Sequence, residues 1–275
     1  MSTTLAQSNV TFIDTEASLL PLLDSIANLG TNPPSLYIDL EGIALGRHGS
    51  ISILSLYIAP TKNTYLIDIH SLGEAAFSTT IKSGTSLKTV LESSAIPKVV
   101  FDIRNDSDAL FSLFQISVDG IKDLQLMELA SRGRSRKFVS GLAKCIEKDS
   151  PISAVAKMEW RATKERGCQL FAPEKGGSYE VFNERPLKPE IMQYCKQDVE
   201  LLPGLYGVYN AKLRKRGQAF WRVQIRETTK DRIKQSQSPS YDGQSNSKAF
   251  GWDDDFIDSA IESWNDDIMM EAMGG

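Results

Sequence analysis

Residues 35–59, SLYIDLEGIALGRHGSISILSLYIA, contain two apolar runs separated by a turn with three glycines. The first run, 35–42, has the length and composition of a buried strand, and the second, 50–59, alternates between apolar and polar residues. Residues 60–63 provide a second turn, and TYLIDI at 64–69 has the pattern of a third strand. The stretch therefore predicts an antiparallel β-meander.

The sequence on either side of the meander alternates between helical and strand patterns. Residues 16–29 have helical spacing behind a cap at Asp14 or Thr15, and two further strands are expected at 98–103 and from 122. Helices are expected at 85–94, 105–114, 140–148 and 153–167, and a long one at 187–213 should bend or break at Pro203. This order predicts an α/β fold with a mixed five-stranded sheet flanked by helices and a helical C-terminal extension.

Composition limits the class of protein. The 275 residues are 41% hydrophobic, and no apolar run reaches the length of about 18 residues that a membrane span needs. The three cysteines are scattered, so neither a zinc site nor a disulfide framework is indicated. With no signal-peptide pattern at the N-terminus, we expect an intracellular protein, cytoplasmic or nuclear.

The charge is unevenly distributed along the chain. The net charge is −4, but residues 252–275 hold eight acidic residues and no Lys or Arg. The remaining 27 acidic and 31 basic residues make the body mildly basic, which is compatible with a polyanionic partner. The Ser/Gln/Gly-rich stretch 236–251 is typical of a flexible linker, and 252–275 has the pattern of an acidic amphipathic tail.

Two carboxylates lie close together in the first strand. Asp39 and Glu41 are two residues apart, so they face one side of the strand while Ile38 and Leu40 face the other. Like charges side by side are costly unless a positive group lies between them, and a hard divalent cation meets that need. The alternative for an isolated D-x-E is a solvent-exposed acidic pair at a strand end.

Two other segments carry acidic residues that are candidates for the same site. Asp106 follows a strand and opens a helix at the carboxyl edge where α/β sites form, although a plain helix-entry charge is the alternative. Asp108 is a second candidate for the same position. Tyr194 and Asp198 are one helical turn apart, which by itself is also typical of a half-buried Tyr beside a solvated Asp.

In this order, the three motifs resemble the DEDDy-type 3′–5′ exonucleases of the RNase D and Werner exonuclease group, within the ribonuclease H-like superfamily. The resemblance covers about residues 34–213 and is closest to the Egalitarian-like branch, where DLEG, a G-R-H-G-like turn and an I-S-I-L-type strand follow one another, as in 39–54 here. Asp106 fits the second motif. One departure is Asp102, which replaces the usual His before that motif.

The resemblance implies a metal-dependent exonuclease that shortens single-stranded RNA or DNA from the 3′ end. It implies two Mg²⁺ or Mn²⁺ ions, roughly 3.5–4 Å apart, held by Asp39, Glu41, Asp106 and Asp198. Tyr194 would orient the attacking water, and its side chain, with a usual pKa of about 10, is a poor base at neutral pH. The exonuclease domain would span residues 1–235.

Candidate contacts to the nucleic acid come from three places. Phosphate charge and base stacking hold single strands, so basic and aromatic residues are the natural candidates. For each, a structural alternative exists: a solvated basic loop, a core tryptophan, or a turn residue. The candidates are Arg132, Arg134, Arg136 and Lys137 in the 130–138 loop, Trp160 and Arg161 in the 153–167 helix, and His48 in the turn after the first strand.

Other functions remain open at this stage. A nuclease-fold module that binds RNA or scaffolds a partner without cutting is one alternative, and a proofreading domain serving a polymerase is another. The acidic tail predicts a protein partner, a solubilising role, or intramolecular docking on the basic stretch 212–234.

Overall fold

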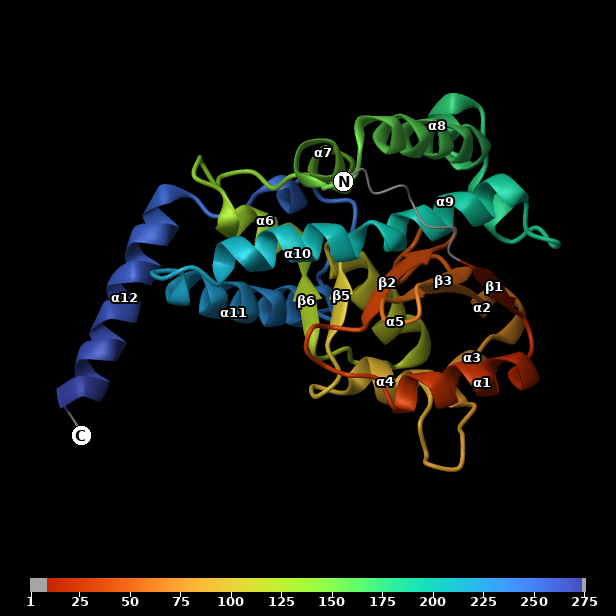
Figure 1. The fold of residues 1–275 in the computed structure, drawn as a ribbon, viewed down its shortest axis with the longest axis horizontal. Helices are drawn as coiled ribbons and strands as arrows, with labels where there is room; N and C mark the ends of the chain where they lie inside the picture. Colours follow the sequence, from red (N-terminus) through yellow and green to blue (C-terminus); the bar gives the residue numbers. More distant parts are fainter. Residues whose placement is uncertain (1–8, 274–275) are drawn as a thin grey trace.

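A mixed sheet forms the centre of the structure (Figure 1). The computed structural model describes the backbone of residues 9–273 and the side chains of residues 9–266. Its strand order is β1-β4-β3-β2-β5-β6. The strands are β1 (Val10–Ile13), β2 (Leu36–Glu41), β3 (Ile53–Ile58), β4 (Asn63–Asp68), β5 (Lys98–Val100) and β6 (Ile121–Asp123).

The sheet confirms the predicted mixed α/β class and adds one strand to the five expected. The meander β2-β3-β4 is antiparallel, as predicted, and β5 and β6 run parallel to β2. The additional strand is β1, which pairs in parallel with β4 at the edge of the sheet. It has only four residues, too few to show a period in the sequence.

Helices cover both faces of the sheet (Figure 1). Helices α1, α4 and α5 pack on one face, and α6, α9 and α10 pack on the other. Of the helices in the described part of the chain, none combines the length and apolar character needed to cross a membrane. Their bounds are α1 (Glu16–Ala27), α2 (Ile69–Leu72), α3 (Ala75–Ser78), α4 (Leu87–Glu92), α5 (Arg104–Phe114), α6 (Leu124–Ser131), α7 (Leu142–Asp149), α8 (Ala154–Phe171), α9 (Pro189–Glu200), α10 (Leu202–Leu213), α11 (Ala219–Ser236) and α12 (Asp254–Met273).

Strand β2 presents different chemistry to the two layers. Ile38 and Leu40 are buried in the cluster shared with α1, α4 and α5. Tyr37 belongs to the opposite cluster, with α6 and α10. Because side chains alternate along a strand, Asp39 and Glu41 share the face of Tyr37, where α9 crosses. The strand therefore supplies apolar contacts on one face and two carboxylates on the other.

The predicted long helix at 187–213 is interrupted near Pro203, as expected on steric grounds. Helix α9 ends at Glu200, and α10 begins at Leu202 with Pro203 in its first turn. Proline lacks a backbone N–H and is tolerated in a first turn, where that donor has no partner in the helix anyway. The break lets α9 follow the β2–β4 side of the sheet while α10 follows β5 and α6.

Residues 236–251, expected to form a flexible linker, lie against the body in the structure. Arg47 donates to three carbonyl oxygens at the start of the segment, at 2.8 to 3.1 Å. Lys248 Nζ lies 2.7 Å from Asn105 Oδ1, and the Gly251 N–H donates to the Lys137 carbonyl at 2.8 Å. The composition is that of a linker, but most of these contacts use backbone groups of the segment, which composition does not report.

The acidic tail forms helix α12, which extends away from the body (Figure 1). Ile257 packs against the cluster around α6 and α10, and the Trp264 ring lies 6.3 Å from that of Phe220 at the start of α11. Phe256 and Ile261 remain exposed, at 45% and 36%. Besides the hydrogen bond from the Trp252 N–H to the Arg136 carbonyl, at 2.8 Å, these contacts of the tail with the body are aromatic and aliphatic.

Candidate active site

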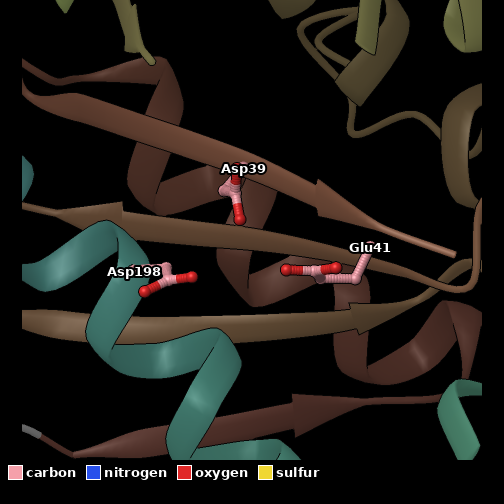
Figure 2. Close-up of side chains that lie close together, drawn as sticks. All are labelled: Asp39, Glu41 and Asp198. Atoms are coloured by element: carbon pink, nitrogen blue, oxygen red, sulfur yellow. The ribbon is translucent and has the colours of Figure 1, made fainter. Parts of the chain in front are cut away.

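Three carboxylates from two distant segments meet above β2 (Figure 2). Asp39 and Glu41 come from the strand and Asp198 comes from α9, and one oxygen from each lies within 4.8 Å of the other two. Asp39 and Glu41 are half-buried, and Asp198 is buried. The sequence prediction that Asp39 and Glu41 share a face matches this geometry, and α9 brings the third acid to the same place.

Helix α9 presents Tyr194 and Asp198 to the sheet from successive turns. Tyr194 is 7% exposed and belongs to a cluster with residues of β3 and β4. Cys195, one residue later, is fully buried in the same cluster, as expected of a core residue. The helical spacing therefore places the phenol and the carboxylate on the side that faces β2, and the thiol packs beside them.

The electrostatics of the cluster call for added positive charge. Burial raises the pKa of Asp39 to about 7, and the nearby Asp198 charge adds to this effect while Lys164 opposes it. Burial, with Asp39 and Asp198 adding to it, raises the pKa of Glu41 well above its usual range. Ionised carboxylates this close are stable only when a cation neutralises them. The donor set, oxygen only and converging on one spot, fits a hard divalent ion such as Mg²⁺ or Mn²⁺.

Tyr194 keeps its proton in this environment. Burial and then the neighbouring carboxylates, Glu41 first, raise the pKa of its phenol well above the usual value. A neutral phenol donates one hydrogen bond and can accept others. Tyr194 can therefore orient a water or a phosphate oxygen beside Asp198, and it is not suited to removing a proton by itself.

The two candidates for the second motif have different surroundings. Asp108 is buried, and Arg47 donates to its carboxylate from Nε at 2.8 Å and from the backbone N–H at 2.9 Å. Asp106 lies in the first turn of α5, and burial followed by the charge of Asp39 raises its pKa well above the usual range. Asp106 is outside the group of three carboxylates but within their field, whereas Asp108 is already paired with Arg47.

Asp102, which stands where the resemblance leads one to expect His, belongs to a structural network. Its carboxylate accepts two hydrogen bonds from Arg104, both at 2.6 Å, and lies 3.5 Å from Arg232. Its backbone has a φ of 63°, a left-handed conformation that Asp tolerates better than most residues. Its N–H donates to Asp123 Oδ1 at 3.1 Å, which holds the strand end ahead of α5.

Lys164 of α8 is a functional candidate to which the sequence prediction gave no role at the metal site. Its Nζ lies 3.1 and 3.4 Å from the two carboxylate oxygens of Asp198 and 4.8 Å from the centre of the Tyr194 ring. In the sequence it is one of several basic residues at helical spacing in 153–167. Only the crossing of α8 over α9 distinguishes it from the others, and no pattern in the sequence indicates that crossing.

Three of the predicted nucleic-acid contacts turn out to be structural. Arg132 is buried and forms an ion pair with Glu128, one turn earlier in α6. Arg136 lies 4.1 Å from the centre of the Trp221 ring and donates to two backbone carbonyls. Trp160 is 5% exposed, so its ring faces are covered and cannot stack on a base. Burial removes Arg132 and Trp160 from the surface, and the half-buried Arg136 is held by Trp221 and the two carbonyls.

The other predicted contacts remain at the surface. Arg134 has a 54% exposed side chain, 3.8 Å from Glu128, and Lys137 is exposed. His48 is exposed in the turn after β2. Arg161 is exposed but forms an ion pair with Glu147 across α7 and α8. These four side chains are accessible to a polyanion.

The chain is similar to known nucleases in sequence and in fold. Residues 10–214 match the family model of the 3′–5′ exonucleases, and no curated protein sequence matches the chain. Trypanosoma brucei RNase D in complex with RNA U12 is similar in fold, with a TM-score of 0.70 at 16% identity over 92% of this chain and 79% of that one. Escherichia coli RNase D, described as an exoribonuclease involved in structured RNA processing, gives 0.59 at 18% identity, over 84% of this chain and 51% of that one.

Brucella melitensis NrnC with bound Mg²⁺ gives a TM-score of 0.53 at 17% identity, over 86% of this chain and 99% of that one. At these identities the likenesses establish a shared ribonuclease H-like fold. The family match covers most of the chain, including β2, α5 and α9 and thus the acidic residues described above. The chain belongs to the 3′–5′ exonuclease family, and its fold is similar to that of RNase D.

Proposed function

We propose that this enzyme is a DEDDy-type exonuclease that shortens single-stranded nucleic acid from the 3′ end with two Mg²⁺ or Mn²⁺ ions. The observation that carries the proposal is the convergence of Asp39 and Glu41 with Asp198 within 4.8 Å. Tyr194, one turn before Asp198 and facing the same cluster, supports the tyrosine subtype. The DLEG–GRHG–ISIL order supports placement in the Egalitarian-like branch.

Four carboxylates would hold the ions. Asp39, Glu41 and Asp198 form the central set, and Asp106 at the start of α5 would complete it, directly or through water. When bound, such ions lower the pKa of the attacking water and stabilise the charge of the leaving oxygen. We propose Asp106 rather than Asp108 for this role, because Arg47 already pairs with the Asp108 carboxylate.

The residues of the chain would position the reactants. In the reaction, a water oxygen bonds to the terminal phosphorus and the bond to the preceding 3′-oxygen breaks. That oxygen gains a proton, and a nucleoside 5′-monophosphate leaves. The protonated Tyr194 hydroxyl would donate a hydrogen bond that aims the water or a phosphate oxygen. Helices α8 and α9, which pack against each other, would limit the access of other water molecules to the acidic cluster.

The substrate is proposed to be single-stranded RNA or DNA, held without regard to sequence. One structural neighbour was solved with RNA, and on this chain the exposed Arg134, Lys137 and Arg161 offer cationic contacts, with His48 as an exposed polar side chain. Phosphate contacts of this type give affinity that falls steeply with salt.

The contacts of residues 236–251 with the body bear on the domain organisation. We propose that the exonuclease body extends through residue 235, that the segment 236–251 packs on it, and that the acidic tail begins at 252. If the tail competes with nucleic acid for basic surface, deletion from Asp254 onward should tighten binding at low salt. Deletion from Gln237 would also remove the contacts of Arg47 and Asn105 with the segment.

Digestion of a 5′-labelled strand tests the proposal. Single-stranded RNA and DNA of one sequence are incubated with the full chain in Mg²⁺, in Mn²⁺ or in EDTA. A ladder shortening from the 3′ end, lost in EDTA and in Asp39→Asn, is expected. A folded protein that binds the strand without cutting it in either metal would favour the alternative, a binding or scaffolding module.

A further inference from the structure

The ammonium group of Lys164 lies within the acidic cluster. It contacts both oxygens of Asp198, at 3.1 and 3.4 Å, and the Asp198 side chain is only 4% exposed. Burial lowers the pKa of Lys164, but its contact with Asp198 and, to a smaller extent, the charges of Glu41 and Asp39 raise the pKa above its usual value. The cluster therefore includes a cation that belongs to the chain itself.

Helix packing fixes the base of this side chain. Lys164 lies one turn before Gly167, and the absence of a side chain at Gly167 lets α8 approach the Tyr194 ring closely. Lys164 thus enters the cluster from a helix rather than from a loop. The side chain is still 25% exposed, and its four-carbon stem and three rotatable donors can serve more than one acceptor.

The Asp198 carboxylate cannot bind Lys164 and a metal ion together as strongly as it binds either one alone. A divalent ion that takes Asp198 as a ligand must share it with the ammonium or displace it. A displaced ammonium beside the cluster would find the nearest available anion, and in an exonuclease that anion is a phosphate of the bound strand.

We propose that Lys164 exchanges partners during the reaction, holding Asp198 before the metal binds and the scissile phosphate afterwards. This inference rests on the proposed metal-dependent function. It makes Lys164 a competitor of the metal for Asp198 and a contact for the substrate. Metal and strand binding should therefore strengthen each other, because each favours the released position of the side chain.

Direct Mn²⁺ titration of the full chain, followed by the electron paramagnetic resonance signal of free Mn²⁺, tests the competition. Lys164→Met removes the charge and keeps the length of the side chain. Lys175→Met is the matched control, because the substitution removes the same unit of charge. Lys175 forms an exposed ion pair with Glu165. We expect Lys164→Met to bind Mn²⁺ about tenfold more tightly than the wild type, and Lys175→Met to bind as the wild type does.

The strand is the second arm of the experiment. A phosphorothioate single strand that resists cleavage should tighten Mn²⁺ binding in the wild type and should have little effect in Lys164→Met. Activity of Lys164→Met should show a raised KM for the cleavable strand. Lys164→Arg keeps the charge and should restore the linkage in part. Lys164→Gln serves in place of Lys164→Met if that variant does not fold.

The outcomes separate the two claims. Unchanged or weaker Mn²⁺ affinity in Lys164→Met, with wild-type affinity that Asp39→Asn abolishes, would overturn the exchange and leave the metal centre standing. Wild-type protein that shows no Mn²⁺ binding sensitive to Asp39→Asn would overturn the proposed function itself.

Discussion

Gly167 of α8 lies directly against Tyr194 of α9. A Cβ added at Gly167 would be 2.7 Å from Tyr194 Cδ2 and 2.9 Å from its Cβ and Cγ, closer than side chains approach. The same crossing brings Lys164 to Asp198, one turn away on each helix. The geometry of the active site therefore depends on a glycine that carries no chemistry of its own.

Gly167→Ala should reduce activity by displacing Tyr194. Overpacking of a closely packed site costs about 1–3 kcal/mol, and the added methyl group would clash with the Tyr194 side chain. Gly207→Ala in α10 is the matched control, because nothing lies within 4 Å of the added Cβ and alanine favours a helix interior by about 0.5–1 kcal/mol. Thermal unfolding and kcat of both variants test this. Wild-type kcat in a folded Gly167→Ala would contradict it.

Tyr194→Phe separates the hydroxyl from the ring. The ring contacts with α8 remain, so the melting temperature should stay near that of the wild type. Turnover should fall by about tenfold to a hundredfold, at or below the lower end of what a positioned proton donor contributes. Metal titration in the same variant should be unchanged. A kcat equal to the wild type would remove the role assigned to the phenol.

Asp106→Asn and Asp108→Asn should have opposite effects. Asp106→Asn should abolish most activity and leave stability unchanged or higher, because burial and like charge already disfavour the ionised carboxylate. Asp108→Asn should lower stability, since it breaks a pair in which Asp108 is 3% exposed. Breaking such a pair costs up to about 3–5 kcal/mol, reduced here because Arg47 is 16% exposed. Denaturant unfolding and digestion assays on both proteins distinguish ligand from structural residue.

The sequence predicted the parts of the site that depend on local periodicity. The two-residue spacing of Asp39 and Glu41 and the four-residue spacing of Tyr194 and Asp198 fixed which faces these residues share. The break at Pro203 followed from its missing N–H. The surroundings of Lys164, Arg132 and Trp160 were not predicted, because they depend on Asp198, on Glu128 and on the packing of α8. Those tertiary contacts leave no pattern in the surrounding sequence.

Metal affinity should rise with pH. The pKa of Asp39 is about 7 in the folded protein against 3.8 for the free side chain. The folded state therefore binds this proton more tightly than the unfolded chain. The contribution of the Asp39 proton to the free energy of unfolding is fully present below about pH 4 and is lost as pH rises through about 7. Protons also compete with the metal, so the rise in melting temperature on adding Mn²⁺ should be larger at about pH 8 than at about pH 5.5.

Asp39→Asn is the control for this pH dependence. Without the carboxyl group, the melting temperature without metal should fall less between about pH 5.5 and 8, and Mn²⁺ should add little at either pH. A metal-induced shift that is the same at both pH values in the wild type would argue against the buried carboxylates as the metal ligands.

Substitutions of Arg132 and of Arg134 in the 130–138 loop should have different effects. Arg134→Ala should weaken binding to single strands and reduce the salt dependence of log K by up to about one phosphate contact, without loss of stability. Arg132→Ala should lower the melting temperature, because it leaves the buried Glu128 without its partner. Binding measured over a range of salt, together with thermal unfolding, tests both. Equal stability losses in the two variants would contradict the assignment.

Anomalous scattering from crystals grown with Mn²⁺ tests the central claim most directly. We predict a Mn²⁺ peak at about 2.0–2.2 Å from a carboxylate oxygen of each of Asp39, Glu41 and Asp198, and its loss in Asp39→Asn. The preparation that gives the peak should shorten a single strand from its 3′ end. A protein that digests the strand while its Mn²⁺ lies elsewhere, or that digests it equally well as Asp39→Asn, would contradict the account.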